Sequence, residues 1–377
     1  MSIKIKPIKV LLYGNVFRDY RSQALVKILL DSGHHISLVC PDFYSTKIKL
    51  FSGLRLLYLV ELLIKAPFAD AIYLPPMNSR FIRSACWAAR VFNKQLIVEM
   101  YISIYDTFVK DRKLLKGKQI NPESRQAQEM FARDILSLKE SDYLIHTAAH
   151  ELDYWEKIFK TKVAKEKVFI APNFNTYSLD YKKSEHQNGT LNICWWGTFI
   201  PLHGLENILE AMKILKANKI DFRCNLFGTD NDLFYVYEKK IKLERLDDCI
   251  SLRKDLRFAD NSLPQYLIDN CDLALGIFGN TDKAYNTVPN KLIEALSMKI
   301  PTLTMESIAL KEFFEPDDLW TCQPKPDAIA QSIQSIAKGS AASVDWEKTR
   351  LKVLDTFSIN RYQEVVAKVL TSASNDF

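Results

Sequence analysis

The 377-residue sequence lacks the features of several large protein classes. Its seven cysteines are scattered and none forms a Cys-x-x-Cys pair, which argues against a zinc site or a disulfide framework and favours reduced thiols. No apolar run reaches the roughly 18–20 residues that a bilayer span needs, and the start of the chain has no long apolar signal region. We therefore expect a cytoplasmic protein that does not span a membrane, although it could rest on the inner face of one.

A strong excess of one charge is also absent. The chain has 51 basic and 45 acidic side chains, a net charge of +6. This mild excess does not predict binding to nucleic acid, and it suits a polyanionic small molecule or an anionic membrane surface equally well. With 47% hydrophobic and 25% charged residues, the composition is that of a globular protein, and the length fits two domains.

Apolar strand-like runs alternate with helical stretches in both halves of the chain. This alternation predicts parallel sheets with helices on both faces, an α/β doubly wound arrangement. We expect residues 1–172 to form one Rossmann-like domain and residues 191–343 a second. The polar stretch 173–190 is interpreted as a linker, and residues 344–377 as a C-terminal helix that packs back on the first domain.

Three loops that follow predicted strands contain candidate ligand-binding residues. Carboxyl ends of parallel strands are where such sheets bind ligands, and helix N-termini attract phosphate. In the first loop we expect Gly14 and Asn15 to contact a phosphate and Arg18 and Arg21 to contact an acceptor. The pattern is not Gly-x-Gly-x-x-Gly, so a simple tight turn is the alternative.

The second and third loops belong to the second half. In the second, pyrophosphate would contact Gly197, Thr198 and His203, with a helix-capping role as the alternative for His203. In the third, Asn290 would cap a new helix, and Glu294, one turn further, would accept hydrogen bonds from both hydroxyls of a ribose. An acid that merely complements the helix dipole is the alternative for Glu294. Further candidates in the third loop are Gly279, Lys283 and Lys291.

Two segments of the first half indicate other contacts. The polar and phenolic segment 101–112 predicts an acceptor site with Tyr105, Asp106 and Arg112, unless it is a salt-bridged surface loop. The segment 47–65 mixes bulky apolar and basic residues, which is compatible with contact to an anionic membrane or with a core-packed helix whose lysines are solvated.

Over nearly its whole length, and most strongly from Trp195 to Thr304, the sequence resembles the retaining glycosyltransferases of the GT-B fold, family 4. The resemblance rests on Pro289-Asn290-Lys291-x-x-Glu294-Ala295 and on the glycine-containing stretch from Gly197 to Gly204, which are similar to a subgroup that assembles polysaccharides and lipid-linked glycans. It implies two Rossmann-like domains facing a central cleft. The first domain would hold the acceptor and the second the donor, with Glu294 on the donor ribose.

Three positions depart from the family pattern. Thr198 stands where the family has an arginine, His203 where it has a lysine, and Asn286 at the first of two acidic positions. We expect the missing positive charge to come from Lys283, Lys291, Arg253 or Lys254. The residues expected to take part in catalysis are Asp106, His203 and Lys291.

The resemblance implies transfer of a hexosyl group from a nucleotide diphosphate sugar, with UDP as the commonest donor base, to a glycan or lipid-linked acceptor in cell-surface polysaccharide synthesis. It implies no cofactor and no metal, and none of the loops above contains an Asp-x-Asp motif. A sugar-nucleotide 2-epimerase of the same fold and a catalytically inactive scaffold subunit remain alternatives.

Overall fold

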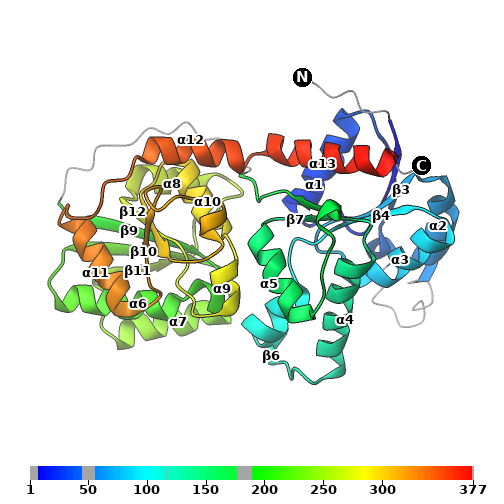
Figure 1. The fold of residues 1–377 in the computed structure, drawn as a ribbon. Helices are drawn as coiled ribbons and strands as arrows, with labels where there is room; N and C mark the ends of the chain where they lie inside the picture. Colours follow the sequence, from blue (N-terminus) through cyan, green and yellow to red (C-terminus); the bar gives the residue numbers. More distant parts are fainter. Residues whose placement is uncertain (1–6, 45–55, 116, 176–188, 376–377) are drawn as a thin grey trace. The chain divides into compact units, whose positions relative to one another are not determined.

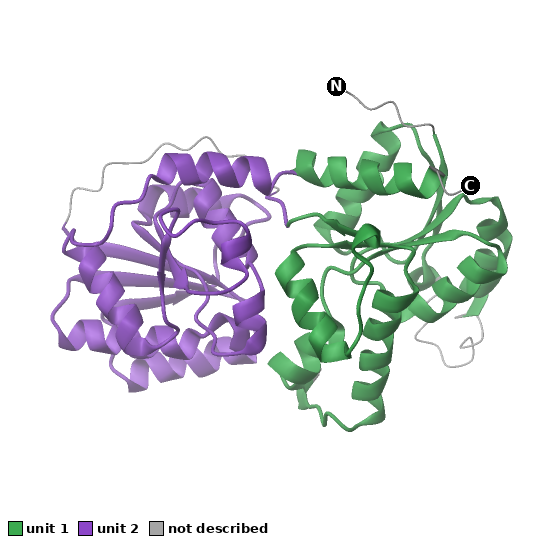
Figure 2. Cartoon of the chain, viewed as in Figure 1, with its two compact units in different colours: residues 1–172, 359–377 green, residues 173–358 purple. Residues whose placement is uncertain are grey.

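A computed structural model describes residues 7–44, 56–115, 117–175 and 189–375 (Figure 1). Contacts divide the chain into two compact units (Figure 2). Unit 1 comprises residues 1–172 and 359–377, and unit 2 comprises residues 173–358. Each unit is a six-stranded parallel sheet with helices on both faces, as the alternation of apolar runs predicts.

The sheet of unit 1 has the strand order β2-β1-β3-β4-β7-β8. Its inner strands read as continuous apolar runs because both faces are covered by helices. The edge strand β8 was not predicted, since its three residues are only half-buried and form no long run. The strands are β1 (Lys9–Tyr13), β2 (His35–Val39), β3 (Ala71–Leu74), β4 (Gln95–Glu99), β7 (Tyr143–His146) and β8 (Val168–Ile170).

Helices of unit 1 pack on both faces of this sheet. Helices α1 (Tyr20–Asp31) and α13 (Ile359–Asn375) contact each other, and α13 also contacts β8. The remaining helices share one apolar core with the sheet, in which Trp155 and Tyr13 are the largest fully buried side chains. These helices are α2 (Leu57–Lys65), α3 (Ile82–Val91), α4 (Arg125–Glu140) and α5 (Ala149–Phe159).

The sheet of unit 2 has the order β11-β10-β9-β12-β13-β14. Every pairing in it is parallel. The chain reverses its direction of winding between β9 and β12, and the loops that follow these two strands meet at the carboxyl edge. The strands are β9 (Leu191–Gly197), β10 (Phe222–Gly228), β11 (Ile250–Arg253), β12 (Leu273–Leu275), β13 (Thr302–Met305) and β14 (Trp320–Cys322).

Two groups of helices cover the two faces of the second sheet. One core contains side chains of α6 (Leu205–Ala217), α7 (Asp232–Leu243) and α11 (Pro326–Ala337). On the other face lie α8 (Ser262–Asn270) and α10 (Asn290–Ser297), and α12 (Trp346–Thr356) packs on α10. The short helix α9 (Asp282–Asn286) precedes α10.

The C-terminal segment 344–377 differs from the expected single helix on the first domain. It forms two helices, of which α12 belongs to unit 2 and α13 to unit 1. The interruption follows from Phe357, which is buried in an apolar cluster of unit 2. In the stretch interpreted as a linker, Asn175 donates its backbone N–H to the carbonyl of Phe357 in unit 2, and residues 176–188 lie outside the described residues.

Within the described ranges, no helix combines the length and the apolar character that crossing a bilayer requires. All seven cysteines are present as thiols, and only Cys249 is not fully buried.

Candidate functional site

The strongest candidate site lies at the carboxyl edge of the second sheet, where winding reverses between β9 and β12. Open α/β sheets bind ligands at this kind of position. β9 ends at Gly197, whose φ of +144° is one that side-chain-bearing residues rarely adopt. A Cβ on Gly197 would lie 2.9 Å from the His203 ring and 3.1 Å from Lys291 Nζ. Glycine is therefore required for these two side chains to approach the backbone here.

Lys291 is the most unusual group at this edge. Its side chain is 5% exposed, and its ammonium lies 4.2 Å from the centre of the Trp195 ring. Nζ makes no hydrogen bond with any part of the chain that the structure describes. Burial lowers the pKa of Lys291 well below its usual range, and Glu294 only partly offsets this. A buried amine without a hydrogen-bonding partner is destabilising unless an anion approaches it.

Glu294 follows Lys291 on the same short helix, α10. It is half-buried, and its carboxylate accepts a hydrogen bond of 2.7 Å from Trp196 Nε1. Burial raises the pKa of Glu294, although the Trp196 hydrogen bond and Lys291 both act to lower it. The Glu294 carboxylate therefore lies at the edge of the site, where the Trp196 indole holds it in place. Sequence reasoning placed Trp196 only in a strand and missed its role in positioning Glu294.

The tip of α10 differs in detail from the prediction. Pro289, and not Asn290, occupies the N-cap position, and no side chain caps the helix. Asn290 is the exposed first residue, and its side-chain oxygen accepts a hydrogen bond of 2.8 Å from Asn173. The ring of Pro289 restricts φ, here −77°, to a value that suits the extended residue before a helix.

The loop after β9 packs directly on the loop after β12. Gly204, with a φ of +63°, lies against the backbone of Phe278, whose N–H donates to the His203 carbonyl at 3.1 Å. Gly279 in turn lies against the carbonyl oxygens of residues 201 and 202. The role that the structure gives Gly279 is thus close packing of two loops. His203 Nδ1 hydrogen-bonds the carbonyl of the exposed Thr198, so Nδ1 carries the proton.

The other predicted cations already have partners. Arg253, at the end of edge strand β11, pairs with Asp255 at 2.7 Å, and Lys254 pairs with Asp230 at 3.0 Å. Lys283 is buried within α9. Among the predicted cations of unit 2, Lys291 is therefore the one that is buried and lacks a hydrogen-bonding partner in the described chain. Asn286, which stands at the first acidic position of the family pattern, donates its side-chain amide to the carbonyl of Asp282.

An Asp-x-Asp sequence does occur in unit 2, directly after β10. It comprises Asp230, Asn231 and Asp232, and sequence reasoning gave it no role. Asn231 accepts hydrogen bonds from the first turn of α7, and Asp230 contacts Lys254 and Tyr235. Asn231 thus caps α7, and Asp230 accepts a hydrogen bond from Lys254.

In unit 1, the first predicted phosphate loop is closed by a residue that the sequence did not single out. Asn78, after β3, accepts a 2.8 Å hydrogen bond from the Asn15 N–H, and its amide packs where a Cβ on Gly14 would lie. The Gly14 N–H donates to Val39. Both backbone donors are therefore engaged within unit 1, which differs from the phosphate contact expected for Gly14 and Asn15.

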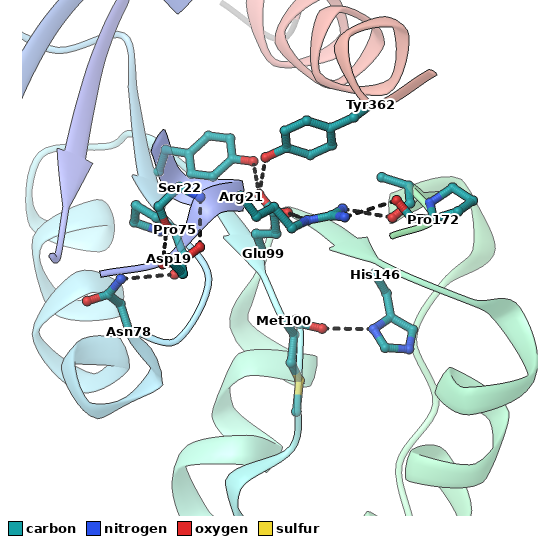
Figure 3. Close-up of polar contacts among 12 residues, drawn as sticks. Asp19, Arg21, Ser22, Pro75, Asn78, Glu99, Met100, His146, Pro172 and Tyr362 are labelled. Carbon is teal, nitrogen blue, oxygen red and sulfur yellow. Dashed lines mark hydrogen bonds and ion pairs between the residues drawn. The ribbon is translucent and has the colours of Figure 1, made fainter. Parts of the chain in front are cut away.

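Arg21 is buried, and its guanidinium points toward Glu99 and Pro172 (Figure 3). Its guanidinium pairs with Glu99 and donates to the carbonyls of Ala171 and Pro172 at 2.7 and 3.0 Å. Tyr73 and Tyr362 both donate to the other carboxylate oxygen of Glu99. Burial opposes the charge of Arg21, but Glu99 more than compensates, so the pKa of Arg21 lies above its usual value. Arg21 joins α1, β4 and α13 and is not an acceptor ligand.

The other predicted acceptor residues divide into exposed and buried groups. Arg18 is exposed and pairs with Asp42 at 3.1 Å. Asp106 is fully buried and accepts a 2.8 Å hydrogen bond from Tyr154, which removes it from reach of an acceptor. Tyr105 packs edge-on against Phe131. The half-buried Arg112 has a pKa lowered by burial and lies over the Phe108 ring.

Known proteins resemble this chain in structure but not in sequence. No family model matches the sequence, and no curated protein matches it. Sucrose-phosphate synthase from Thermosynechococcus elongatus is 14% identical with a TM-score of 0.70, over 98% of this chain and 100% of that one. Anabaena HepE in complex with UDP and glucose is 13% identical with a TM-score of 0.65, over 97% and 100%. A glycosyltransferase from Rickettsia africae is 14% identical with a TM-score of 0.65, over 99% and 100%.

At these identities the likeness establishes the fold. The chain consists of two Rossmann-like α/β units of the GT-B type that these glycosyltransferases share.

Proposed function

We propose that the protein is a retaining glycosyltransferase that moves a hexosyl group from a nucleoside diphosphate sugar to a glycan or lipid-linked acceptor in cell-surface polysaccharide synthesis. The observation that carries the proposal is the buried ammonium of Lys291, without a hydrogen-bonding partner beside Gly197. Structural likeness to HepE, which was crystallised with UDP-glucose, supports UDP as the donor base.

The diphosphate of the donor supplies the anion that Lys291 lacks. Lys291 lies in the first turn of α10, where the helix dipole is positive and no side chain caps the backbone. A charge-assisted hydrogen bond from Lys291 would strengthen as the diphosphate departs, because negative charge develops on the leaving oxygen. His203, whose ring lies close to Gly197, is the second side chain expected near the phosphates.

Glu294 is assigned to the ribose of the donor. A half-buried carboxylate can accept hydrogen bonds from two neighbouring hydroxyls, and Trp196 already fixes its orientation. Its negative charge next to a diphosphate site would be unfavourable for phosphate alone. A diol contact explains why an acid and a lysine lie one turn apart.

The reaction requires no protein base. The bond between the anomeric carbon and the diphosphate oxygen breaks, and a bond to the acceptor hydroxyl oxygen forms on the same face. The acceptor proton passes to the departing phosphate oxygen, and a nucleoside diphosphate leaves. Burial of Asp106 is compatible with this scheme, because no carboxylate is needed at the acceptor. Lys291 and the α10 N-terminus would supply the positive charge, so we expect turnover to persist in excess chelator.

Calorimetry against UDP, GDP, ADP and CDP tests the proposal. We expect one of these nucleotides, UDP first, to bind, and the corresponding sugar nucleotide to be consumed when an acceptor glycan is added. The departures at Thr198, His203 and Asn286 favour one competing function, an inactive scaffold subunit. Binding of none of the four nucleotides would establish the scaffold and overturn the transferase.

Replacing Glu294 with alanine is expected to raise the donor dissociation constant roughly tenfold or more, because the hydrogen bonds to the ribose are lost. Trp196→Phe is expected to have a smaller effect in the same direction, since it removes only the N–H that orients Glu294. Isothermal titration with UDP measures both. An unchanged dissociation constant for Glu294→Ala contradicts the ribose assignment.

Donor binding is expected to depend on pH in a bell shape. Glu294 must be ionised to accept the diol, so affinity falls as the pH drops through its raised pKa. Lys291 must be protonated to bind the diphosphate, so affinity falls as the pH rises through its lowered pKa. Titrations in buffers of different ionisation enthalpy should show proton uptake on the basic limb. Glu294→Gln should remove the fall in affinity at low pH, and Lys291→Met should remove the fall at high pH. A pH profile of Lys291→Met identical to that of wild type would contradict the assignment of the basic limb to Lys291.

A further inference from the structure

Helix α2 of unit 1 exposes several large apolar side chains on its outer side. Its inward side is formed by Leu62 and by Ala66, the residue after the helix, both fully buried. The outward side of α2, together with the residues that flank the helix on either end, carries six large apolar residues, which we call the α2 face. They are Leu56, Leu57, Val60, Leu63, Ile64 and Phe68, each between 42% and 73% exposed.

Polar side chains do not interrupt the α2 face. The helix has two charged residues, Glu61 and Lys65, and they pair with each other at 2.5 Å. Lys65 also donates to the carbonyl of Leu38, which holds its stem along the helix. A soluble surface helix normally turns polar residues outward, so this distribution indicates a partner that accepts an apolar face.

The surroundings of the α2 face combine apolar and basic groups. α2 contacts the short helix η1 (Pro41–Tyr44), where Phe43 is 68% exposed and lies against Phe17, itself 57% exposed. Next to these rings, Arg18 and Arg80 share one carboxylate, Asp42, which leaves a net positive charge.

We propose that the α2 face docks the protein onto an anionic lipid bilayer. Aliphatic and aromatic side chains beside basic residues are the chemistry by which a helix lies in the headgroup region, where the apolar face enters the acyl boundary and the cations contact anionic headgroups. A protein partner of the same size would bury the apolar face but would not need the flanking cations. The inference rests on the exposure of α2 and not on the proposed transferase activity.

Sedimentation with vesicles tests the proposal. Wild-type protein is expected to sediment with vesicles of equal parts phosphatidylglycerol and phosphatidylcholine, weakly with pure phosphatidylcholine, and less at high salt because the charge contribution is screened. The triple variant Val60→Ser, Ile64→Ser, Phe68→Ser should lose about tenfold or more of this binding, since each position contributes exposed apolar area. All three positions are exposed, so the variant should fold.

A matched control changes equally exposed apolar residues in the other unit. Leu233→Ser, Val236→Ser, Leu243→Ser on α7 should bind vesicles as wild type does. Both triple variants should bind UDP with unchanged affinity, which separates failure of this inference from failure of the proposed function. Absence of wild-type binding to the anionic vesicles, or equal binding by the α2 variant, overturns the proposal. The proposal is also overturned if sedimentation equilibrium shows that wild type is a dimer and the α2 variant is a monomer, because the α2 face would then join two copies of the chain.

Discussion

Lys291→Met is expected to make the protein more stable and, at the same time, to weaken its binding of UDP by roughly 10- to 150-fold. The ammonium is buried over Trp195 and has no hydrogen-bonding partner, so the folded protein bears a desolvation cost of about 1–3 kcal/mol that an apolar side chain of similar length removes. The lost affinity corresponds to one charge-assisted hydrogen bond to a phosphate, about 1.5–3 kcal/mol.

Differential scanning calorimetry and isothermal titration with UDP measure the two effects on the same sample. Lys299→Met is the matched control, because Lys299 follows α10 closely and pairs with Glu347 at 2.7 Å on the surface. It should change neither the melting temperature nor the UDP affinity appreciably, since exposed ion pairs contribute little. A Lys291→Met protein that is less stable than wild type and binds UDP normally would show that Lys291 is a packing residue.

Glu99→Gln is expected to destabilise unit 1 by about 3–5 kcal/mol, because it leaves the Arg21 guanidinium buried without its counter-charge. Tyr73 and Tyr362 also lose the carboxylate that accepts both hydroxyls, so the contact between β4 and α13 is weakened. For a unit of this size the melting temperature should fall by roughly 6–20 °C. UDP affinity should not change, since all four residues belong to unit 1 and the proposed donor residues belong to unit 2.

The double variant Arg21→Met, Glu99→Leu should be more stable than Glu99→Gln alone, because removing both charges leaves no isolated buried ion. Arg83→Met is the control, since Arg83 pairs with Glu129 at 3.2 Å and both side chains are exposed. It should cost about 1 kcal/mol or less. Equal melting temperatures for Glu99→Gln and wild type would contradict the structural assignment of Arg21.

Features set by neighbouring residues could be predicted from the sequence. The alternation of apolar runs and turns gave most strands and helices of both units, and the spacing of Lys291 and Glu294 placed both on one short helix after β12. The short edge strands β8 and β14 have too few residues to form a pattern. The position of α10 was predicted correctly, but its N-cap residue is Pro289 and not Asn290.

Features set by distant residues could not be predicted. Asn78, which closes the first loop, is 63 residues from its partner Asn15, and Tyr362 is 263 residues from Glu99. Only the strand order brings such pairs together, so Arg21 looked like a surface cation in the sequence. The same reason hid the contact of Trp196 with Glu294, which joins β9 to the helix after β12.

A crystal structure of the protein soaked with UDP tests the central claim most directly. We expect the diphosphate within hydrogen-bonding distance of Lys291 Nζ beside Gly197, and the ribose hydroxyls on the Glu294 carboxylate. Density for UDP elsewhere, with Lys291 still packed on Trp195 and Glu294 bound only to Trp196, would contradict the account.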